Sequence, residues 1–505
     1  MTRRDVVAKT TVLLLLGALV AAGFLTQKPG TEGNPGQIGP VSAGTGVWVC
    51  SGLFPSAVRK QTVGVANPGA EPVTGRLTLQ GGGKVHLVRQ LTVPGLSAMS
   101  FDVGLELSPL AAPAEITSSQ ASGYFAVLEL NTDKAAVMEA LDQTGGSVTD
   151  VAVSRCSKGV TSLLDLPGGI SIRGTQTDVF MANALGSDAV VDSFLATEQG
   201  TEEPSRLRKF PVLSGSQASI RISDEARRRW VIALRGQTSA GEIDLSGEIR
   251  SDGTRVGAGI ARLERAPEQS SAWLFPALVE GEEEKAVVVV VNPSEETRIV
   301  KARVLPDLSV QEATPGLSPA GAAASFSVPP KEAVTFTPSP GLGEGARYGL
   351  VVESQEDKPI LAAVTTWLTP PRRGLGSVTG APRAERRWVL VGPRALGIGN
   401  VSSLQVTVMN TADRTARVKI SSFGEGASSP GPGQDSFEVP SGRISTIDLS
   451  GTQVVTGERS LVVESDLPVV AQARLRTEAG QSPQGYDTFL LVPLSQSPSP
   501  VAGAG

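Results

Sequence analysis

"VVVVVNPSEETRIVKARV", residues 287–304, is the stretch that decides the fold class. Five valines are far fewer than the ~20 apolar residues that a helix needs to cross a bilayer, and β-branched side chains favour a strand. The run stops at Asn292-Pro293 because proline has no N–H for strand pairing, while asparagine suits turns. Polar and apolar residues then alternate in "RIVKARV", as in a strand with one buried face. We therefore expect two strands joined by a hairpin turn at "NPSEET".

The same element occurs four times in the chain. The other copies read "TVGVANPGAEPVTGRLTL" (62–79), "DVFMANALGSDAVVDSFL" (178–195) and "QVTVMNTADRTARVKISS" (405–422). Their turn asparagines and that of the first stretch are Asn67, Asn183, Asn292 and Asn410, at successive spacings of 116, 109 and 118 residues. A search for such periodicity precedes any motif search, because a missed repeat misassigns the whole fold.

A second landmark follows the same period. Trp48 and Trp273 each lie 19 residues before their asparagine, Trp388 lies 22 before, and Leu164 occupies this position in the second copy. Repeats of this length suit β-sandwich domains of ~100 residues and exceed the ~40–50 residues of a propeller blade. The tryptophans are expected to pack between the sheets.

The sequence therefore predicts an all-β protein of about four tandem β-sandwich domains. We refer to them as repeats 1 to 4, which cover residues 47–160, 161–268, 269–382 and 383–495. A Gly/Pro-rich flexible linker (28–46) precedes them, and a tail (496–505) that is expected to be disordered follows.

A short apolar segment at the N-terminus indicates export. Positive charges, the last of them Lys9, precede the uncharged stretch Thr10–Gln27, which is the charge order of an export signal. As a helix it would measure roughly 25 Å, slightly less than a ~30 Å hydrocarbon core, and Val20-Ala21-Ala22 offers a small-residue cleavage site. Residues 1–27 are interpreted as a cleaved signal peptide or a retained membrane anchor. Either way we expect an extracytoplasmic protein, secreted or membrane-anchored.

The chain has two cysteines, Cys50 and Cys156, so only one intramolecular pairing is possible. Exported proteins fold in an oxidising environment, which favours a disulfide between them. Two buried free thiols are the alternative. Because there is no CxxC motif, thiol–disulfide catalysis is not indicated.

The stretch "VTVMNTADRTARVKI" resembles the early strands of the tandem immunoglobulin-like modules found in bacterial envelope proteins. The whole chain is similar to an actinobacterial family of exported or membrane-anchored proteins that carry a domain of unknown function. It shares with that family the apolar N-terminal segment, "WVCSG" (48–52) and the Asn-turn repeats. Members often lie near a glycosyltransferase gene, which implies a role in envelope glycan biology. The family has no established chemistry, so the resemblance implies no functional residue.

Two basic stretches in repeat 2, "SRLRKF" and "EARRRWV", form the candidate binding surface for an anionic partner such as acidic glycans or phospholipid headgroups. We call this set the basic patch: Arg206, Arg208, Lys209, Arg227, Arg228 and Arg229. Charges that protect exposed strand edges from association are the alternative explanation. The net charge of −5 argues against nucleic-acid binding, which needs a dense basic face.

The residues that common catalytic and metal sites require are scarce. His86 is the only histidine, and alternation in "KVHLV" places it on a strand, so a Ser-His-Asp triad or a zinc site has little support. We expect no enzyme activity, no cofactor and no metal. The predicted function is a non-catalytic scaffold or adhesion-like binding protein of the cell envelope, with an envelope protein or glycan as partner and the membrane as a further partner if residues 1–27 are uncleaved. The alternatives are an accessory subunit of an envelope glycosyltransferase system and a glycan-processing enzyme, which would need convergent carboxylates in a cleft at a repeat interface.

Overall fold

The computed structural model describes residues 46–107, 123–144, 148–308, 324–338, 340–430, 436–477 and 485–494. Within them the protein is all-β and its sheets are antiparallel, as predicted. The predicted signal or anchor segment (1–27), nearly all of the linker and the tail (496–505) lie outside the described residues. Among the residues that are described, no helix has the length and apolar character needed to span a membrane.

Repeat 1 contains two sheets. We call the first its outer sheet, in the order β4-β3-β6-β1-β9, and the second its axial sheet, in the order β5-β2-β7-β8. The elements are β1 (Gly46–Leu53), β2 (Arg59–Asn67), β3 (Val73–Gly81), β4 (Lys84–Val93), β5 (Ser97–Asp102), the one-turn helix α2 (Val103–Leu107), β6 (Tyr124–Leu130), β7 (Ala136–Gln143), β8 (Asp150–Arg155) and β9 (Ser157–Lys158).

Repeat 2 follows the same plan. Its outer sheet has the order β10-β16-β12-β13 with β14 paired to β12, and its axial sheet has the order β15-β11-β17-β18. The elements are β10 (Leu163–Gly169), β11 (Thr175–Ala182), β12 (Ala189–Thr197), β13 (Gly200–Glu202), η1 (Ser205–Leu207), β14 (Phe210–Val212), β15 (Gln217–Arg221), α3 (Ile222–Glu225), β16 (Ile232–Ala240), β17 (Asp244–Ser251) and β18 (Gly259–Glu264).

Repeat 3 has an outer sheet β19-β24-β21-β22 and an axial sheet β23-β20-β25-β26. The elements are β19 (Ala272–Val279), β20 (Glu284–Val291), β21 (Arg298–Pro306), β22 (Ala324–Val328), β23 (Ala333–Phe336), β24 (Arg347–Ser354), η3 (Gln355–Asp357), β25 (Leu361–Leu368) and β26 (Leu375–Thr379).

In repeat 4 the two sheets share one long strand, β33, which pairs with β27 and β29 in its first half and with β28 and β34 in its second. The other repeats use two shorter strands at this place, for example β6 and β7. The elements are β27 (Glu385–Leu390), η4 (Arg394–Leu396), β28 (Val401–Asn410), β29 (Ala416–Gly424), β30 (Ala427–Pro430), β31 (Phe437–Val439), β32 (Arg443–Asp448), α4 (Gln453–Thr456), β33 (Ser460–Thr477), β34 (Tyr486–Leu490) and β35 (Val492–Pro493).

The connection at Asn292-Pro293 is not a hairpin, contrary to the sequence prediction. β20 pairs with β23 and β25, whereas β21 pairs with β22 and β24 in the other sheet. The turn therefore carries the chain across the core from the axial to the outer sheet. Alternating residues gave the two strands correctly, but that pattern does not reveal whether consecutive strands pair with each other or face each other across a core.

The four turn asparagines are buried and make the same hydrogen bonds. The side-chain amide of Asn292 donates to the carbonyls of Glu296 (2.6 Å) and Val328 (3.0 Å), and its Oδ1 accepts the N–H of Ser294 (3.0 Å). Each of the other three likewise donates to the carbonyl four residues ahead and to a valine carbonyl: Asn67 to Val93, Asn183 to Val212 and Asn410 to Val439. The asparagine therefore holds the turn to the end of a neighbouring strand.

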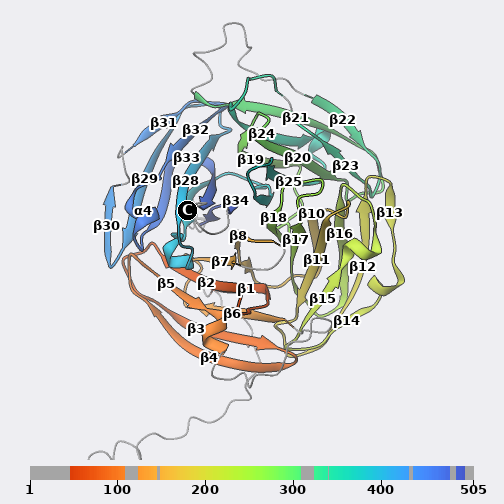
Figure 1. The fold of residues 1–505 in the computed structure, drawn as a ribbon, viewed down its shortest axis with the longest axis horizontal. Coiled ribbons are helices and arrows are strands. Elements are labelled where there is room, and N and C mark those ends of the chain that lie inside the picture. Colours follow the sequence, from red (N-terminus) through yellow and green to blue (C-terminus); the bar gives the residue numbers. More distant parts are fainter. Residues whose placement is uncertain are drawn as a thin grey trace, which may run out of the picture. The chain divides into compact units, whose positions relative to one another are not determined.

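The last strands of the axial sheets are neighbours around a common axis. β8 contacts β18 and β34, and β26 contacts the same two strands from the other side. In Figure 1, the labels β8, β18 and β34 lie near the middle and the outer sheets lie at the periphery. The four repeats thus close into a ring in which repeat 4 contacts repeat 1.

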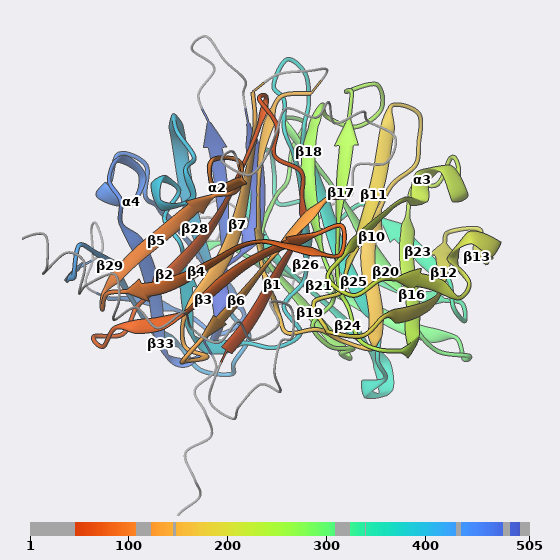
Figure 2. The same cartoon turned by 90° about the horizontal axis from the view of Figure 1, so that it is seen from below.

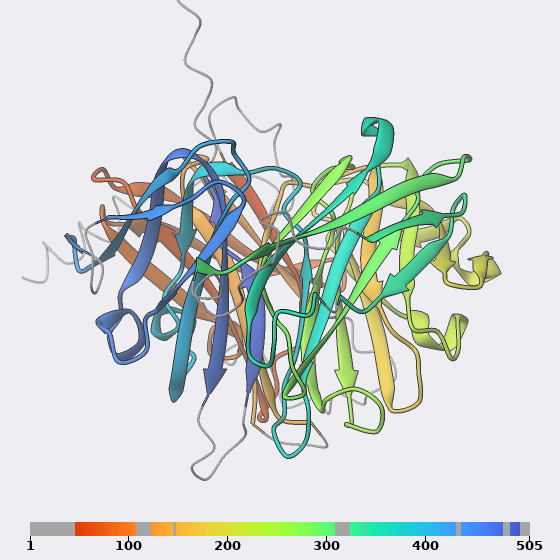
Figure 3. The same ribbon diagram turned by 90° about the horizontal axis from the view of Figure 1, so that it is seen from above.

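Repeats 1 to 3 pack onto the next repeat through their first strand, and repeat 4 packs onto repeat 1 through its last strand, β35. β1 of repeat 1 contacts β17 of repeat 2, β10 contacts β25, β19 contacts β33, and β35 contacts β7 of repeat 1. The side views show the strands of the repeats running between two opposite faces (Figures 2 and 3). Trp48, Trp273 and Trp388 are buried in the cores, as predicted, and the indole N–H of Trp273 donates to the carbonyl of Ile360 (2.8 Å).

Candidate functional site: the axial pocket

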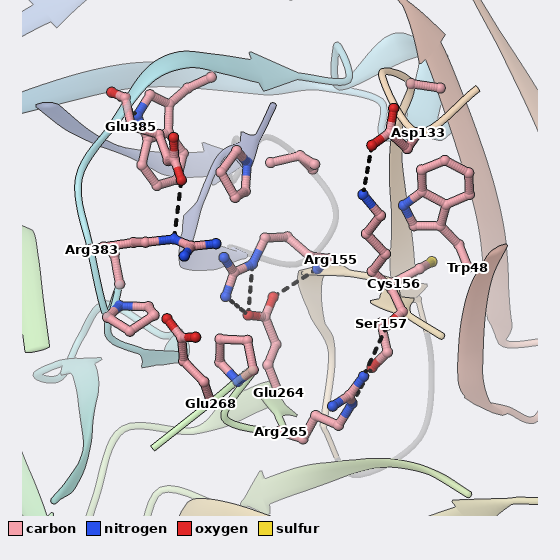
Figure 4. Close-up of a pocket in the computed structure, with 18 residues that line it drawn as sticks. Trp48, Asp133, Arg155, Cys156, Ser157, Glu264, Arg265, Glu268, Arg383 and Glu385 are labelled. Atoms are coloured by element: carbon pink, nitrogen blue, oxygen red, sulfur yellow. Dashed lines mark hydrogen bonds and ion pairs between the residues drawn. The ribbon is translucent and has the colours of Figure 1, made fainter. Parts of the chain in front are cut away.

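A pocket of about 330 Å³ opens where the axial strands β8 and β18 end (Figure 4). All four predicted repeats contribute to its lining, so the pocket depends on closure of the ring. We call it the axial pocket, and its lining residues are Trp48, Asp133, Ala135, Arg155, Cys156, Ser157, Lys158, Glu264, Arg265, Pro267, Glu268, Ala381, Pro382, Arg383, Glu385, Trp388, Val492 and Pro493.

A partly buried ion pair between Arg155 and Glu264 lies at the axial end of this pocket. One carboxylate oxygen of Glu264 accepts the backbone N–H of Arg155 (2.7 Å), and the other accepts its Nε (2.9 Å) and Nη2. Two-point contacts of this kind fix both groups strongly. Because both oxygens of Glu264 are engaged, this carboxylate is a structural group and is poorly placed to act as a general acid or base.

The predicted disulfide between Cys50 and Cys156 is present beside this ion pair. It joins β1 to the residue after Arg155, and Cys156 contributes to the pocket lining. The cross-link therefore holds the end of β8, and with it the guanidinium of Arg155, at the pocket. A buried disulfide is typical of proteins that fold outside the cytoplasm.

The rim of the pocket carries weaker ion pairs. Lys158 lies 3.4 Å from Asp133, and Arg383 lies 3.1 Å from Glu385. Among the described residues, no ion pair involves Glu268, which is exposed. Exposed ion pairs contribute little to stability. A charged group of a ligand can therefore replace one partner of such a pair with a small loss of free energy.

Prolines and small side chains form the apolar lining: Pro267, Pro382, Pro493, Ala135, Ala381 and Val492. Trp48 and Trp388 also contact the pocket, but they are only 3% and 1% exposed and offer little open ring face. Sugars usually stack on open aromatic faces. The lining therefore combines charged groups with small apolar surfaces and offers little open aromatic face.

The opposite end of the axial strands is built around the carboxylate of Asp150. Its Oδ1 accepts the backbone N–H groups of Val151 (2.8 Å) and Tyr486 (3.0 Å), and its Oδ2 accepts those of Ile260 (2.8 Å) and Leu375 (3.3 Å). One donor comes from each repeat. Burial raises the pKa of Asp150 to about 8, although the four N–H bonds act in the opposite direction.

Strand register shows that these four donors are equivalent. Asp150 begins β8 opposite Gln143, and Gly259 begins β18 opposite Ser251 at the same position of repeat 2. Gly374 and Gly485 take this position in repeats 3 and 4, where their carbonyls accept the N–H groups of Leu368 and Thr477. Each donor is the next residue along its strand. A Cβ on Gly259 would lie 2.3 Å from Oδ2 of Asp150, so the glycine leaves room for the carboxylate.

A second carboxylate, Asp487, is buried one step further along the axis. It accepts the backbone N–H groups of Val153 (2.5 Å) and Thr488 (2.8 Å). Burial raises its pKa well above the usual range, and the nearby carboxylates of Asp150 and Glu264 act in the same direction. These two aspartates lie in the packed axis and not in the pocket, so we assign them to ring closure.

A buried ionic network joins repeats 1 and 2. Glu248 receives a two-point contact from Arg59 (3.0 and 2.5 Å) and one from Arg250 (2.6 Å), while Arg262 bonds Glu139 (2.9 Å). Burial tends to raise the pKa of Glu248, but the charges of Arg59 and Arg250 outweigh it and hold that pKa below its ordinary value.

The junction of repeats 3 and 4 uses the same two positions with opposite charges. Arg59 and Glu284 each lie eight residues before their turn asparagine. Glu248 and Arg474 also occupy equivalent positions. Each is the strand partner of a residue that lies five positions before a turn asparagine, Asp178 for Glu248 and Gln405 for Arg474. Arg474 contacts Glu284 at 2.5 Å, and the hydroxyl of Tyr486 donates to the same carboxylate at 3.1 Å.

The structure divides the predicted basic patch. Arg206 pairs with Glu225 (3.6 Å), Arg208 with Glu203, and Arg229 with Glu202 (2.6 Å). In the part of the chain that the structure describes, no ion pair involves the other three residues, Lys209, Arg227 and Arg228, all of which are exposed.

Arg208 and Lys209 line a groove of about 680 Å³ between the outer sheet of repeat 2 and the Asn-Pro turn of repeat 3. We call it the junction groove, lined by Leu163, Asp192, Ser193, Phe194, Glu203, Arg208, Lys209, Arg235, Gly236, Gln237, Pro293 and Lys331. The guanidinium of Arg235 lies 5.5 Å from the centre of the Phe194 ring.

Other candidate positions have structural roles. His86 lies on β4, as predicted, where its Nε2 is 3.0 Å from the carbonyl of Gly81 and its ring packs edge-on against Tyr124. Among the described residues, Cys50, Glu139 and Cys156 come close enough together to suggest a metal site. The disulfide uses both sulfurs, so this group does not fit a metal ion.

Sequence reasoning missed Asp150, Asp487 and the pocket residues. The sequence does contain a signal for Asp150, because it aligns with Gly259, Gly374 and Gly485. This alignment can be recognised only when the last axial strands of the four repeats are placed in register. Most of the pocket residues lie in the segments where one repeat ends and the next begins, and the sequence analysis singled out Trp48, Trp388 and Cys156 for the core and the disulfide but not for a pocket.

Comparison with known proteins gives a partial match. Residues 265–493, which cover repeats 3 and 4, match the model of a family of unknown function (DUF5719). A crystal structure of Thermotoga maritima 1070 aligns with 13% sequence identity over 23% of this chain and 95% of that chain. Its TM-score of 0.19 is too low to indicate a shared fold. No curated protein matches the chain.

Proposed function

We propose that the protein is an exported, non-catalytic binding protein of the cell envelope that receives a polypeptide segment of an envelope partner in the axial pocket. In this proposal the repeats are tandem immunoglobulin-like sandwiches, as in the actinobacterial family that the sequence resembles. Residues 1–27 direct export and, if they are retained, anchor the protein in the membrane.

One observation carries this proposal: the pocket lies at the ring axis and every repeat contributes to it. Its rim offers exposed ion pairs that a partner's charged side chains can replace, and Glu268 adds an acidic group without an ion-pair partner among the described residues. A glycan-processing enzyme is less well supported, because Glu264 is held on both oxygens by Arg155.

Site-specific photo-cross-linking in native envelopes tests the proposal. A photoreactive residue replaces Pro382 in the pocket, or Val88 on β4, which is 49% exposed and distant in sequence from the pocket residues. We expect a discrete protein adduct from position 382 that is absent from position 88 and lost in Glu268→Lys. Identical adducts from both positions, or none from 382, would refute the proposal. A glycosyltransferase in the adduct would favour the accessory-subunit alternative.

The junction groove supports a second candidate, the binding of an anionic partner. Lys209 is exposed there beside Arg208 and Lys331, and Arg227 and Arg228 add positive charge after α3. Binding of acidic polysaccharide and of anionic lipid vesicles distinguishes the two sources of negative charge. Lys209→Glu should weaken binding to the true partner, while Arg386→Glu, an exposed control in repeat 4, should not. Equal effects of the two variants would remove this candidate.

A further inference from the structure

The end of the axis opposite the pocket has the geometry of an anion site. Four backbone N–H groups from four different repeats converge on two oxygen atoms of one carboxylate, at 2.8 to 3.3 Å. Convergent backbone N–H groups are a common way in which proteins bind anions. Hydrogen bonds to a carboxylate are also stronger than those between neutral groups.

Most of this anion site is formed by repeats other than the one that contains Asp150. Three of its four donors, Ile260, Leu375 and Tyr486, belong to repeats that carry glycine where repeat 1 has Asp150. A Cβ on Gly259 would overlap the oxygen of Asp150, whereas a Cβ on Gly374 or Gly485 would collide with Tyr486 or Val151, the donor residues of the neighbouring repeat. The four positions thus form a pseudo-fourfold cradle with a single occupant.

Asp487, the next carboxylate along the axis, is held differently. It takes one N–H from repeat 1 and one from its own strand. Its nearest glycine is Gly376, where a Cβ would lie 3.2 Å from Oδ1. The fourfold convergence of donors is therefore specific to Asp150.

We propose that the N–H groups of Val151, Ile260, Leu375 and Tyr486 form a binding site for one small monocarboxylate, which this chain fills with the side chain of Asp150. The side chain acts as an internal ligand that ties the four repeats together at the axis. This inference is independent of the partner bound by the axial pocket.

Chemical rescue tests the inference. Asp150→Gly gives repeat 1 the residue found at this position in the other three and empties the cradle. Its thermal midpoint is measured at pH 9, above the pKa of about 8 of the native Asp150 carboxyl, in increasing sodium formate, with sodium chloride at equal ionic strength as the salt control. We expect a midpoint well below that of the wild type and a saturable rise of several degrees with formate but not with chloride.

Two matched proteins separate the cradle from general salt effects. The wild type has a filled cradle, and Arg235→Met is destabilised at a buried ion pair with Asp165 that involves no cradle residue. Neither should gain from formate over chloride. If Asp150→Gly does not fold, its refolding yield replaces the midpoint as the readout. Failure of formate to restore either quantity selectively overturns the proposal, as does equal rescue of Arg235→Met.

Discussion

The carboxylate of Asp150 accepts the backbone N–H of Tyr486 at 3.0 Å, although the two residues are 336 positions apart in the sequence. This bond joins the first repeat to the fourth. Together with the bonds from Ile260 and Leu375, it makes one side chain common to all four repeats at the point where their axial strands meet. Removal of that side chain should therefore affect the ring as a whole.

Asp150→Asn should destabilise the protein although it preserves the shape of the side chain. The amide nitrogen cannot accept a hydrogen bond, so at least one buried N–H loses its acceptor, at about 1–3 kcal/mol for each group. Denaturant unfolding should show a lower free energy of unfolding by at least that amount. Wild-type stability in Asp150→Asn would contradict the role assigned to the carboxylate.

The stability of the protein should depend on pH through the axial carboxyls. Burial raises the pKa of Asp150 from 3.8 to about 8, so the folded protein holds this proton while the unfolded chain has lost it. The free energy of unfolding should fall as pH rises from about 4 to about 8, by up to about 1.4 kcal/mol per pH unit for this group. Above pH 8 the stabilisation that comes from the bound proton is lost. Asp487 adds a change of the same sign.

Denaturant titrations between pH 5 and pH 9 measure this dependence, with Asp150→Asn as the reference. The difference in the free energy of unfolding between wild type and variant should shrink as pH rises. A difference that grows toward pH 9 would show that the carboxyl is ionised in the folded protein throughout this range.

The reversed ion pairs predict different outcomes of charge exchange at the two junctions. Removing one partner of a buried pair costs about 3–5 kcal/mol, so Glu284→Arg and Arg474→Glu should each lower the midpoint of unfolding strongly. The double exchange should recover part of the loss, because it restores the contact with the signs inverted, although an arginine at position 284 would face Arg476, which lies 3.7 Å from the native Glu284.

The corresponding exchange of Arg59 and Glu248 should recover little. An arginine at position 248 would face Arg250 and Arg262 as well as position 59, whereas the native carboxylate contacts all three cations. Thermal unfolding of both sets of single and double variants measures this contrast, and equal recovery at the two junctions would be evidence against it.

Removal of the disulfide should destabilise the protein. The bridge closes a loop of 106 residues, for which the chain-entropy model gives about 4.7 kcal/mol and typical measured values are about 2–4 kcal/mol. Cys50→Ser/Cys156→Ser should lose stability in this range under oxidising conditions. Intact-mass analysis after alkylation checks the pairing, because labelling of both cysteines without prior reduction is incompatible with it.

Asn292→Asp should show that the amide donors, and not only the turn conformation, matter. Aspartate keeps the acceptor for the N–H of Ser294 but places a carboxylate against the carbonyls of Glu296, Val328 and Pro329. We expect a loss of roughly 2–5 kcal/mol from buried unsatisfied and repelled acceptors. Asp substitution of an exposed turn residue, Glu295→Asp, is the matched control and should change stability by less than about 0.5 kcal/mol.

The sequence predicted the local elements well and their long-range relations poorly. The strands around Asn292, the buried tryptophans and the Cys50–Cys156 bridge follow from residue patterns that act over a few positions or from the only pairing available. The hairpin predicted at the Asn-Pro turn was wrong, because the turn joins two different sheets. Strand partners are determined by packing and not by the turn residues alone.

The candidate site could hardly be predicted from the sequence. Arg155 and Glu264 meet only because repeat 2 packs beside repeat 1 at the axis, and the exposed basic residues that attracted attention are partly neutralised by Glu202, Glu203 and Glu225. Pairing between groups that lie far apart in the chain depends on the ring, which periodicity alone does not specify.

Small-angle X-ray scattering of residues 38–505, the compact unit of the chain, tests the central claim that the four repeats close into a ring. A compact chain of this length has a radius of gyration of about 23 Å, and the account predicts a value near it that does not depend on protein concentration. A radius near twice that value, as expected for domains strung out in tandem, would contradict ring closure and with it the axial pocket.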